Sequence, residues 1–300
     1  LYSSAASDVY KRQDWLTNKV DRCVTGKVAN QQCTGELQLP LNNCGLVALD
    51  FTGVNGIATS IGFSPISSLI DPKSGTKNSI GKALTNIIWA PLKNNLKSVS
   101  LSANWMWPCN NSGEDFRLYQ AVEACSKFAI ELGINIPTGK DSLSMKQKYS
   151  NLEVKAPGTV IISASAHCSD IKKVVTPVIL PDGGDLYYID FSNDKCYLGG
   201  SAFAQALGSI GKKTPSIKSA KYFKSAFNIT QNLIKKGKIS SGHDIGSGGL
   251  ITSLMELCFS SKNIGSVSYT HLRAHETPEH RVWRGGGGKK KGGGGGGGGG

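Results

Sequence analysis

The sequence lacks any apolar run of the about 20 residues that a membrane-spanning helix requires, and it shows no secretory signal pattern. Its eight cysteines include no Cys-x-x-Cys pair, so no zinc or thiol redox motif is readable. Isolated cysteines in a chain of this length are typical of a reducing compartment rather than of a disulfide framework. We therefore expect a soluble cytoplasmic protein with no membrane partner.

Acidic residues are also scarce: 21 Asp and Glu stand against 34 Lys and Arg, a formal net charge of +13. Part of this excess lies in the end segments, for example in the lysine run at 289–291. A mildly basic interior fits an enzyme of anionic substrates. The interior has no basic run with interleaved aromatic residues, so we expect no nucleic-acid partner.

Both ends of the chain differ in composition from its interior. Residues 285–300 are glycine apart from three lysines, and such a segment buries too little apolar surface to offset its ordering entropy. Residues 1–13 and the stretch before the glycines resemble adapter-derived sequence. We therefore expect 1–13 and 266–300 to be non-native, and we assign the fold to 14–265.

Hydrophobic periodicity predicts strands that alternate with helices, an α/β or α+β fold. Alternating or buried apolar patterns predict strands over 45–51, 98–103, 159–166 and 185–191. Apolar stripes at helical spacing predict helices over 79–89, 114–132, 201–207, 219–236 and 248–259. A Pro- and Gly-rich stretch at 177–184 predicts a boundary between one subdomain over 14–176 and the beginning of a second over 177–265.

A first candidate site is the segment Thr138-Gly139-Lys140-Asp141-Ser142, which we expect to form a turn after a helix. Gly139 permits a positive φ or a close backbone approach, while Lys140 and Ser142 suit a phosphate. The alternative is a capping turn, with Asp141 or Ser142 as the N-cap and Lys140 solvated. Residue types leave the two interpretations even, and the phosphate-loop spacing Gly-x-x-x-x-Gly-Lys is absent.

A second candidate is the glycine-rich start of a predicted helix, Gly-His-Asp-Ile-Gly-Ser-Gly-Gly at 242–249. Such a start can bring backbone N–H groups and the helix dipole to an anion, and Asp244 can hold a Mg²⁺ ion that bridges phosphates. The alternative is a plain loop in which Asp244 caps the helix. Glycine beyond the needs of capping has an entropic cost, which favours the functional interpretation.

Two further groups are weaker by themselves. Lys82 and Asn86 lie four residues apart on one face of a predicted helix, and Asn86 can offer a carbonyl oxygen to a hard cation. Spacing alone favours a solvated Lys82 and a hydrogen-bonded Asn86. Asn42 and Asn43 precede a predicted strand, where a loop turn is the default interpretation.

Six segments, taken together, resemble a known family. They are Asp-Arg-Cys-Val-Thr-Gly at 21–26, Gln-Gln-Cys at 31–33, Ala-Leu-Thr-Asn at 83–86, Ser-Ala-Asn-Trp-Met at 102–106, Gly-Lys-Asp-Ser-Leu-Ser-Met at 139–145 and Gly-His-Asp-Ile at 242–245. In this order and spacing they resemble the long single-chain phosphoribosylformylglycinamidine synthases of purine biosynthesis, over essentially all of 14–265. Any one segment alone would be a weak signal.

The resemblance implies a fragment of an ATP-dependent carbon–nitrogen ligase. In that family a glutaminase domain releases ammonia, which displaces the phosphorylated amide oxygen of formylglycinamide ribonucleotide. The synthetase region is similar to two fused copies of the aminoimidazole ribonucleotide synthetase fold, and this chain resembles the second copy. The first copy and the glutaminase are missing, so we expect no activity from this chain alone. Aminoimidazole ribonucleotide synthetase itself and a non-catalytic nucleotide-binding half are the alternatives.

The resemblance also implies roles for single residues. Asn43, Asn86 and Asp244 fall on positions that hold Mg²⁺ in relatives. Asn42 and Gly246 fall on positions that contact ATP or ADP. Ser142 falls on a contact to the substrate phosphate, in the same segment as Gly139, Lys140 and Asp141.

Four positions depart from the family pattern and weaken the implied metal site. Asn43 stands where relatives often have Asp, and Gly246-Ser247 stands where they often have Ser-Asp. Lys82 stands where relatives carry Glu, and an ammonium group offers no lone pair to Mg²⁺.

Overall fold

A six-stranded sheet organises the chain. The computed structural model describes residues 21–39, 41–180, 184–262, 265 and 282–284. The strand order is β1-β2-β3-β8-β4-β5, and neighbours run antiparallel except β4 and β5, which are parallel. The strand bounds are Val28–Asn30 (β1), Gly45–Ala48 (β2), Gly56–Gly62 (β3), Thr159–Cys168 (β8), Ser100–Met106 (β4) and Asn135–Ser142 (β5). This mixed sheet confirms the predicted fold class.

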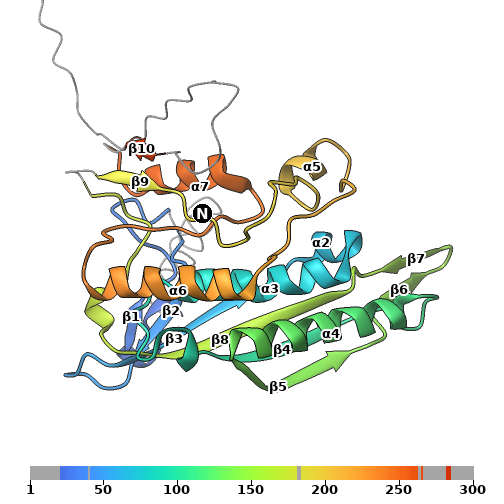
Figure 1. Cartoon of the computed structure of the whole chain (residues 1–300), viewed down its shortest axis with the longest axis horizontal. Coiled ribbons are helices and arrows are strands. Elements are labelled where there is room, and N and C mark those ends of the chain that lie inside the picture. Colours follow the sequence, from blue (N-terminus) through green and yellow to red (C-terminus); the bar gives the residue numbers. More distant parts are fainter. Residues whose placement is uncertain (1–20, 40, 181–183, 263–264, 266–281, 285–300) are drawn as a thin grey trace, which may run out of the picture.

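Helices cover one face of the sheet (Figure 1). They include α2 (Pro65–Ile70), α3 (Pro72–Ile87) and α4 (Glu114–Leu132). Helix α4 has the bounds that its apolar stripe predicts, and Gly133 ends it in the left-handed region with φ of 72°. Alternate residues of β3, such as Ala58, are buried against α3, while their neighbours are exposed on the other face.

Helix α3 begins seven residues before the start that periodicity predicts. The Asp71 carboxylate accepts hydrogen bonds from the backbone N–H groups of Lys73 and Ser74, and Pro72 occupies the first helical position. A capping acid followed by proline is a helix start in its own right, independent of the apolar stripe further on.

The C-terminal part of the chain, from residue 185 on, packs in part against the core between the sheet and its helices. It contains β9 (Asp185–Tyr187), α5 (Ala202–Ala206), α6 (Ala220–Lys235) and α7 (Gly249–Cys258), and β9 pairs with β10 (Val282–Arg284). The Phe223 ring of α6 meets the Phe128 ring of α4 edge to face, with centroids 6.2 Å apart. Helix α6 therefore shares one hydrophobic core with the sheet layer.

Some expectations lie outside the described residues. Residues 181–183 of the predicted boundary are among them, so the division at 177–184 stays a prediction. The end segments 1–13 and 266–300 also lie outside, apart from 282–284. Within the described part of the chain, no helix combines the length and the apolar character needed to cross a bilayer.

The prediction of a turn at 139–142 is wrong. These residues form the end of β5, an edge strand, where Gly139 pairs with Ala103 and Ser142 pairs with Met106 of β4. The next element is another strand, so Asp141 and Ser142 cap no helix either. An edge strand is bonded on one side only and meets solvent on the other, which permits the polar composition that suggested a turn.

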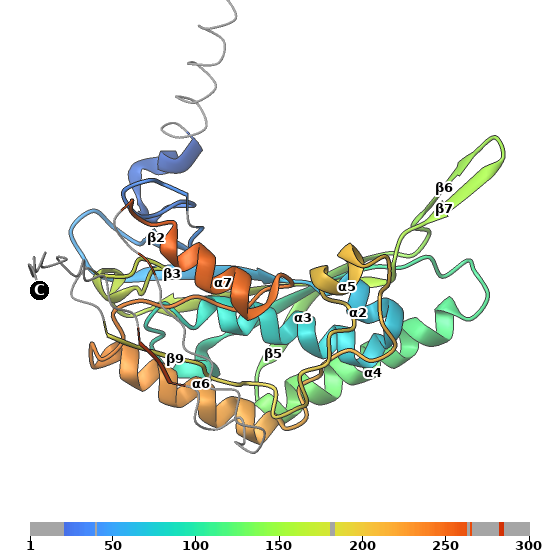
Figure 2. The same ribbon diagram turned by 90° about the horizontal axis from the view of Figure 1, so that it is seen from above.

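Two features of the sheet region were not predicted from the sequence. Strand β3 consists of Gly, Ala, Thr, Ser and Ile, so its alternation of buried and exposed positions has little contrast in hydrophobicity. A hairpin of β6 (Lys146–Tyr149) and β7 (Leu152–Lys155) follows β5 and projects from the body of the molecule (Figure 2).

Candidate functional site

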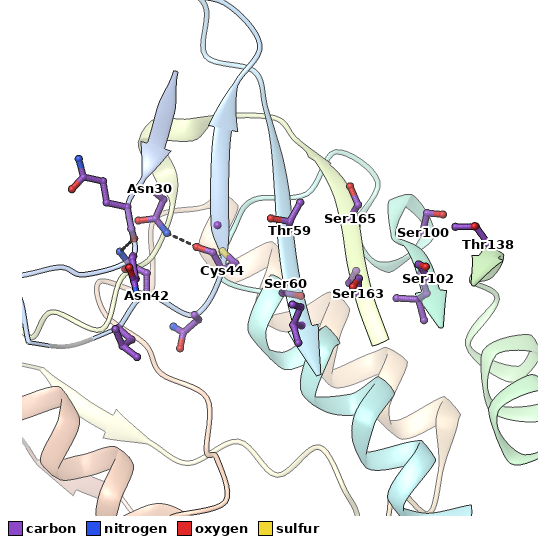
Figure 3. A pocket seen from close by; sticks show the side chains of 18 of the residues that line it. Asn30, Asn42, Cys44, Thr59, Ser60, Ser100, Ser102, Thr138, Ser163 and Ser165 are labelled. Atoms are coloured by element: carbon purple, nitrogen blue, oxygen red, sulfur yellow. Dashed lines mark hydrogen bonds between the residues drawn. The ribbon is translucent and has the colours of Figure 1, made fainter. Parts of the chain in front are cut away.

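The face of the sheet opposite the helices holds a cavity of about 790 Å³. Hydroxyl side chains line it in rows that cross the strands (Figure 3). Thr59 of β3, Ser165 of β8 and Ser100 of β4 are register neighbours in one row. Ser163 and Ser102 stand in the next row, beside Thr138 of β5. The residues that line this cavity include no charged side chain.

Asn42 stands at the β1–β2 end of this cavity (Figure 3). Its side-chain amide donates to the Gln31 carbonyl at 2.6 Å, and its backbone N–H donates to the Gln32 carbonyl at 2.9 Å. The Asn42 Oδ1 atom is buried and has no hydrogen-bond partner among the described residues. A buried acceptor without a partner is unfavourable unless a ligand supplies the donor.

Asn43 connects the cavity to the glycine-rich segment 242–249. Its Nδ2 donates to the Gly242 carbonyl at 3.0 Å, and its Oδ1 accepts from the Asp244 N–H at 3.3 Å. Only this orientation of the amide satisfies both contacts, because a carbonyl cannot donate and an N–H cannot accept. The fold thus brings together two predicted site residues that are 201 positions apart.

Helix α7 holds Asp244 from its other side. The Ser253 hydroxyl donates to the Asp244 carbonyl oxygen at 3.2 Å. His243 Nδ1 lies 3.3 Å from the Asp244 carboxylate, and its Nε2 lies 2.9 Å from Glu256. Burial by itself lowers the pKa of His243, but the two carboxylates outweigh it and the pKa is raised above its ordinary value.

Asp244 is therefore not a helix cap. The N-cap of α7 is Gly248, which makes no side-chain capping bond. Gly246 has open space where a side chain would stand, so a ligand can approach its backbone closely. These observations favour the functional interpretation of this segment over the plain loop.

Asn86 and Lys82 reach the end of β3 from α3. Asn86 Nδ2 donates to the Ile61 carbonyl at 3.1 Å. The Lys82 ammonium lies 5.0 Å from the centre of the Phe63 ring. Ile61 and Asn43 both line the cavity on this sheet. Ile61, whose carbonyl binds Asn86, thus lines the same cavity as Asn43, which binds the Asp244 backbone.

The segment 139–142 lies elsewhere on the sheet. Gly139 approaches β4 so closely that a Cβ atom there would stand 2.3 Å from the Ala103 carbonyl oxygen, and its φ is not positive. Lys140 Nζ donates to the Ser142 hydroxyl at 2.9 Å. No hydrogen bond between described residues joins this segment to Asn43, Asn86 or Asp244, although the adjacent Thr138 lines the same cavity as Asn43.

Sequence reasoning missed the hydroxyl rows. Ser163 and Ser165 alternate with Ile162, Ala164 and Ala166, which are buried on the helix side. A two-residue alternation of this kind signals a strand with a polar face. The match of that face to β3 and β4 depends on strand order, which the local pattern does not contain.

The residues at this site do not fit a hard divalent cation. Asp244 supplies a single carboxylate, which already contacts His243, and the Asn43 oxygen already accepts a hydrogen bond. No cluster of three or more His, Cys, Asp or Glu side chains suited to a metal occurs in the described part of the chain. Lys82, on the helix that carries Asn86, adds a positive charge and no ligand oxygen.

Known proteins match both the sequence and the fold. The family model described as the FGAR-AT PurM_N-like domain matches residues 12–167. A chloroplastic/mitochondrial phosphoribosylformylglycinamidine synthase of Arabidopsis thaliana is 44% identical over 247 residues, and the Homo sapiens enzyme of that name is 43% identical over 247 residues. Each alignment covers 82% of this chain and 18% of the relative, so the chain spans about a fifth of their length.

Solved structures share the fold at low sequence identity. T. maritima PurL complexed with FGAR gives a TM-score of 0.52 at 15% identity, over 72% of this chain and 33% of that chain. T. maritima PurL complexed with ADP gives 0.51 at 14%, over 73% and 32%. The model match covers more than half of the chain, and the chain therefore belongs to the FGAR-AT PurM_N-like domain family, in a region that corresponds to part of a phosphoribosylformylglycinamidine synthase.

Proposed function

We propose that this chain is the nucleotide-binding part of the synthetase region of a glutamine-dependent ligase. The complete enzyme converts formylglycinamide ribonucleotide, ammonia and ATP into the amidine, ADP and phosphate. Phosphoryl transfer turns the amide oxygen into a leaving group, and ammonia displaces it. Ammonia comes from glutamine in a glutaminase domain outside this chain. The first synthetase half also lies outside this chain. The enzyme works in the cytoplasm.

The bond from Asn43 to the Asp244 loop is the observation that carries the proposal. It brings two segments that are distant in the sequence to one end of a cavity, beside the unpartnered Asn42 oxygen. The Asn42 Oδ1 atom would accept a hydrogen bond from the nucleotide, and the Gly246 backbone would lie close to the phosphates of the nucleotide. The names of the fold neighbours support both ligands, because T. maritima PurL is described in complexes with FGAR and with ADP.

The remaining predicted residues have roles suited to their positions. Lys140 and Ser142 share a hydrogen bond at an exposed sheet edge, where they would bind the substrate phosphate together with the Asp141 and Gly139 backbone. The Mg²⁺ expected from the resemblance would find one carboxylate, Asp244, so no chemical step of this chain depends on it here.

A non-catalytic nucleotide site is the second candidate. The presence of Lys82 and the single carboxylate at Asp244 favour it, because phosphoryl transfer normally relies on a divalent cation. In this case ADP would stabilise the fold and would not turn over.

Calorimetric titration of the chain with ADP tests nucleotide binding. We expect saturable binding that is lost in Asn43→Ala, because that change releases the 242–244 loop. Failure of the unmodified chain to bind ADP would contradict the proposal. In the full-length enzyme, Asp244→Ala that keeps folding but abolishes amidine formation would favour the catalytic site, whereas unchanged turnover would favour the structural one.

A further inference from the structure

We propose that this chain binds the phosphates of a nucleoside di- or triphosphate directly through the Lys82 ammonium, without a divalent cation. The inference rests on the proposed function, since it concerns the same nucleotide site. The Lys82 side chain would supply the positive charge at the phosphates that a metal ion otherwise supplies.

The position of Lys82 is the first support. Its ammonium lies at the end of β3, 5.0 Å from the Phe63 ring, one helical turn before Asn86. Asn86 donates to the Ile61 carbonyl at the same strand end, and Ile61 lines the same cavity as Asn43. Lys82 therefore stands on the element that presents Asn86 to the site.

The charge balance is the second support. None of the ion pairs between described residues includes Lys82, although its side chain is partly buried. The carboxylates of Asp244 and Glu256 both contact His243. A partly buried cation without a counterion attracts an anion, and a divalent cation placed beside it would meet repulsion.

A phosphate chain is the anion that matches these groups. Lysine acts as a compact point charge with three donors, which suits terminal phosphate oxygens. The open space at Gly246 allows a second contact from the backbone, and the hydroxyl-lined cavity next to Asn42 can receive an uncharged base and ribose.

Calorimetric titration of the 300-residue chain with ADP, in Mg²⁺ and separately in EDTA, tests this inference. We compare the unmodified chain with Lys82→Met, which keeps the apolar stem, and with Lys82→Glu, which supplies a carboxylate. The matched control is Lys77→Glu, because Lys77 lies on the same helix with its ammonium 5.9 Å from the Phe128 ring, away from the site. Circular dichroism melting verifies that each variant folds. If Lys82→Glu does not fold, the affinity of Lys82→Met for ADP tests the inference by itself.

We expect the unmodified chain and Lys77→Glu to bind ADP equally in both media, within about twofold. Lys82→Met should lose about tenfold or more in affinity in both media, since one charge-assisted contact is removed. Lys82→Glu should bind in Mg²⁺ and fail in EDTA. Binding of the unmodified chain that requires Mg²⁺, or an unchanged Lys82→Met, would overturn the inference and leave the proposed function standing. Absence of ADP binding in both media would overturn both.

Discussion

Gln231 satisfies three backbone groups at once. Its Nε2 donates to the carbonyls of Ile88 and Ala90, and its Oε1 accepts from the Leu92 N–H at 2.8 Å. Ile88, Ala90 and Leu92 are buried and follow the end of α3. They belong to no helix or extended strand that would pair these backbone groups. One fully buried polar side chain from α6 thus completes the hydrogen bonding of a turn more than 130 residues earlier.

Replacing Gln231 by leucine should destabilise the chain by about 3 kcal/mol, because it leaves three buried backbone groups unpaired. Urea unfolding measures this change. Gln205→Leu is the control, since Gln205 is exposed and its replacement should cost less than about 0.5 kcal/mol. Equal effects from the two variants would mean that the buried segment finds other partners.

His243 should make stability depend on pH. Its pKa is raised in the folded state by Asp244 and Glu256 against the effect of burial. A group with a raised folded-state pKa stabilises fully below its unfolded pKa of about 6.5, and this stabilisation disappears as pH rises through the folded-state value. The difference in unfolding free energy between the chain and His243→Gln should therefore be largest in mild acid and shrink above neutrality. A difference that stays constant with pH would contradict this assignment.

Among whole elements, β5 shows how close packing fixes a glycine. Gly139→Ala would place a methyl group 2.3 Å from the backbone oxygen of Ala103, so the edge strand has to move away from β4. We expect a loss of about 1–3 kcal/mol in thermal or urea unfolding. Gly184→Ala serves as the control, because nothing lies within 4 Å of a side chain at that position. A tolerated Gly139→Ala would show that β5 slides without cost.

Elements with a strong period could be predicted from the sequence and others could not. Helix α4 follows from a regular apolar stripe and a glycine stop, down to both of its ends. Strand β3 is built mostly of small residues, so its buried and exposed positions differ little in hydrophobicity, and β5 is a polar edge strand. Local composition therefore predicted a strand at neither place.

The same limit applies to the candidate site. The residue types of Asn43 and the Asp244 loop could be singled out, yet their hydrogen bond depends on how two distant segments meet. The hydroxyl rows likewise arise from the order β3-β8-β4, which no single stretch contains.

At the scale of the whole molecule, the packing of α6 determines whether a chain that ends at residue 176 is stable by itself. Phe223 and Phe227 of α6 belong to the same core as Phe128 and Leu84. A chain that ends at residue 176 should therefore lose on the order of 4 kcal/mol or more, the burial of two aromatic side chains. Its urea midpoint measures this, beside a control that ends at residue 265. An unchanged midpoint would mean that the predicted subdomain 14–176 folds independently.

The bond between Asn43 and the Asp244 loop also sets a time order for synthesis. The asparagine leaves the ribosome 201 residues before its partner, so the two halves of the site cannot meet while most of the chain is still being made. Pairings of such long range form late in folding. Any nucleotide held between them would consequently mark a polypeptide that has been translated past this point and has closed on itself.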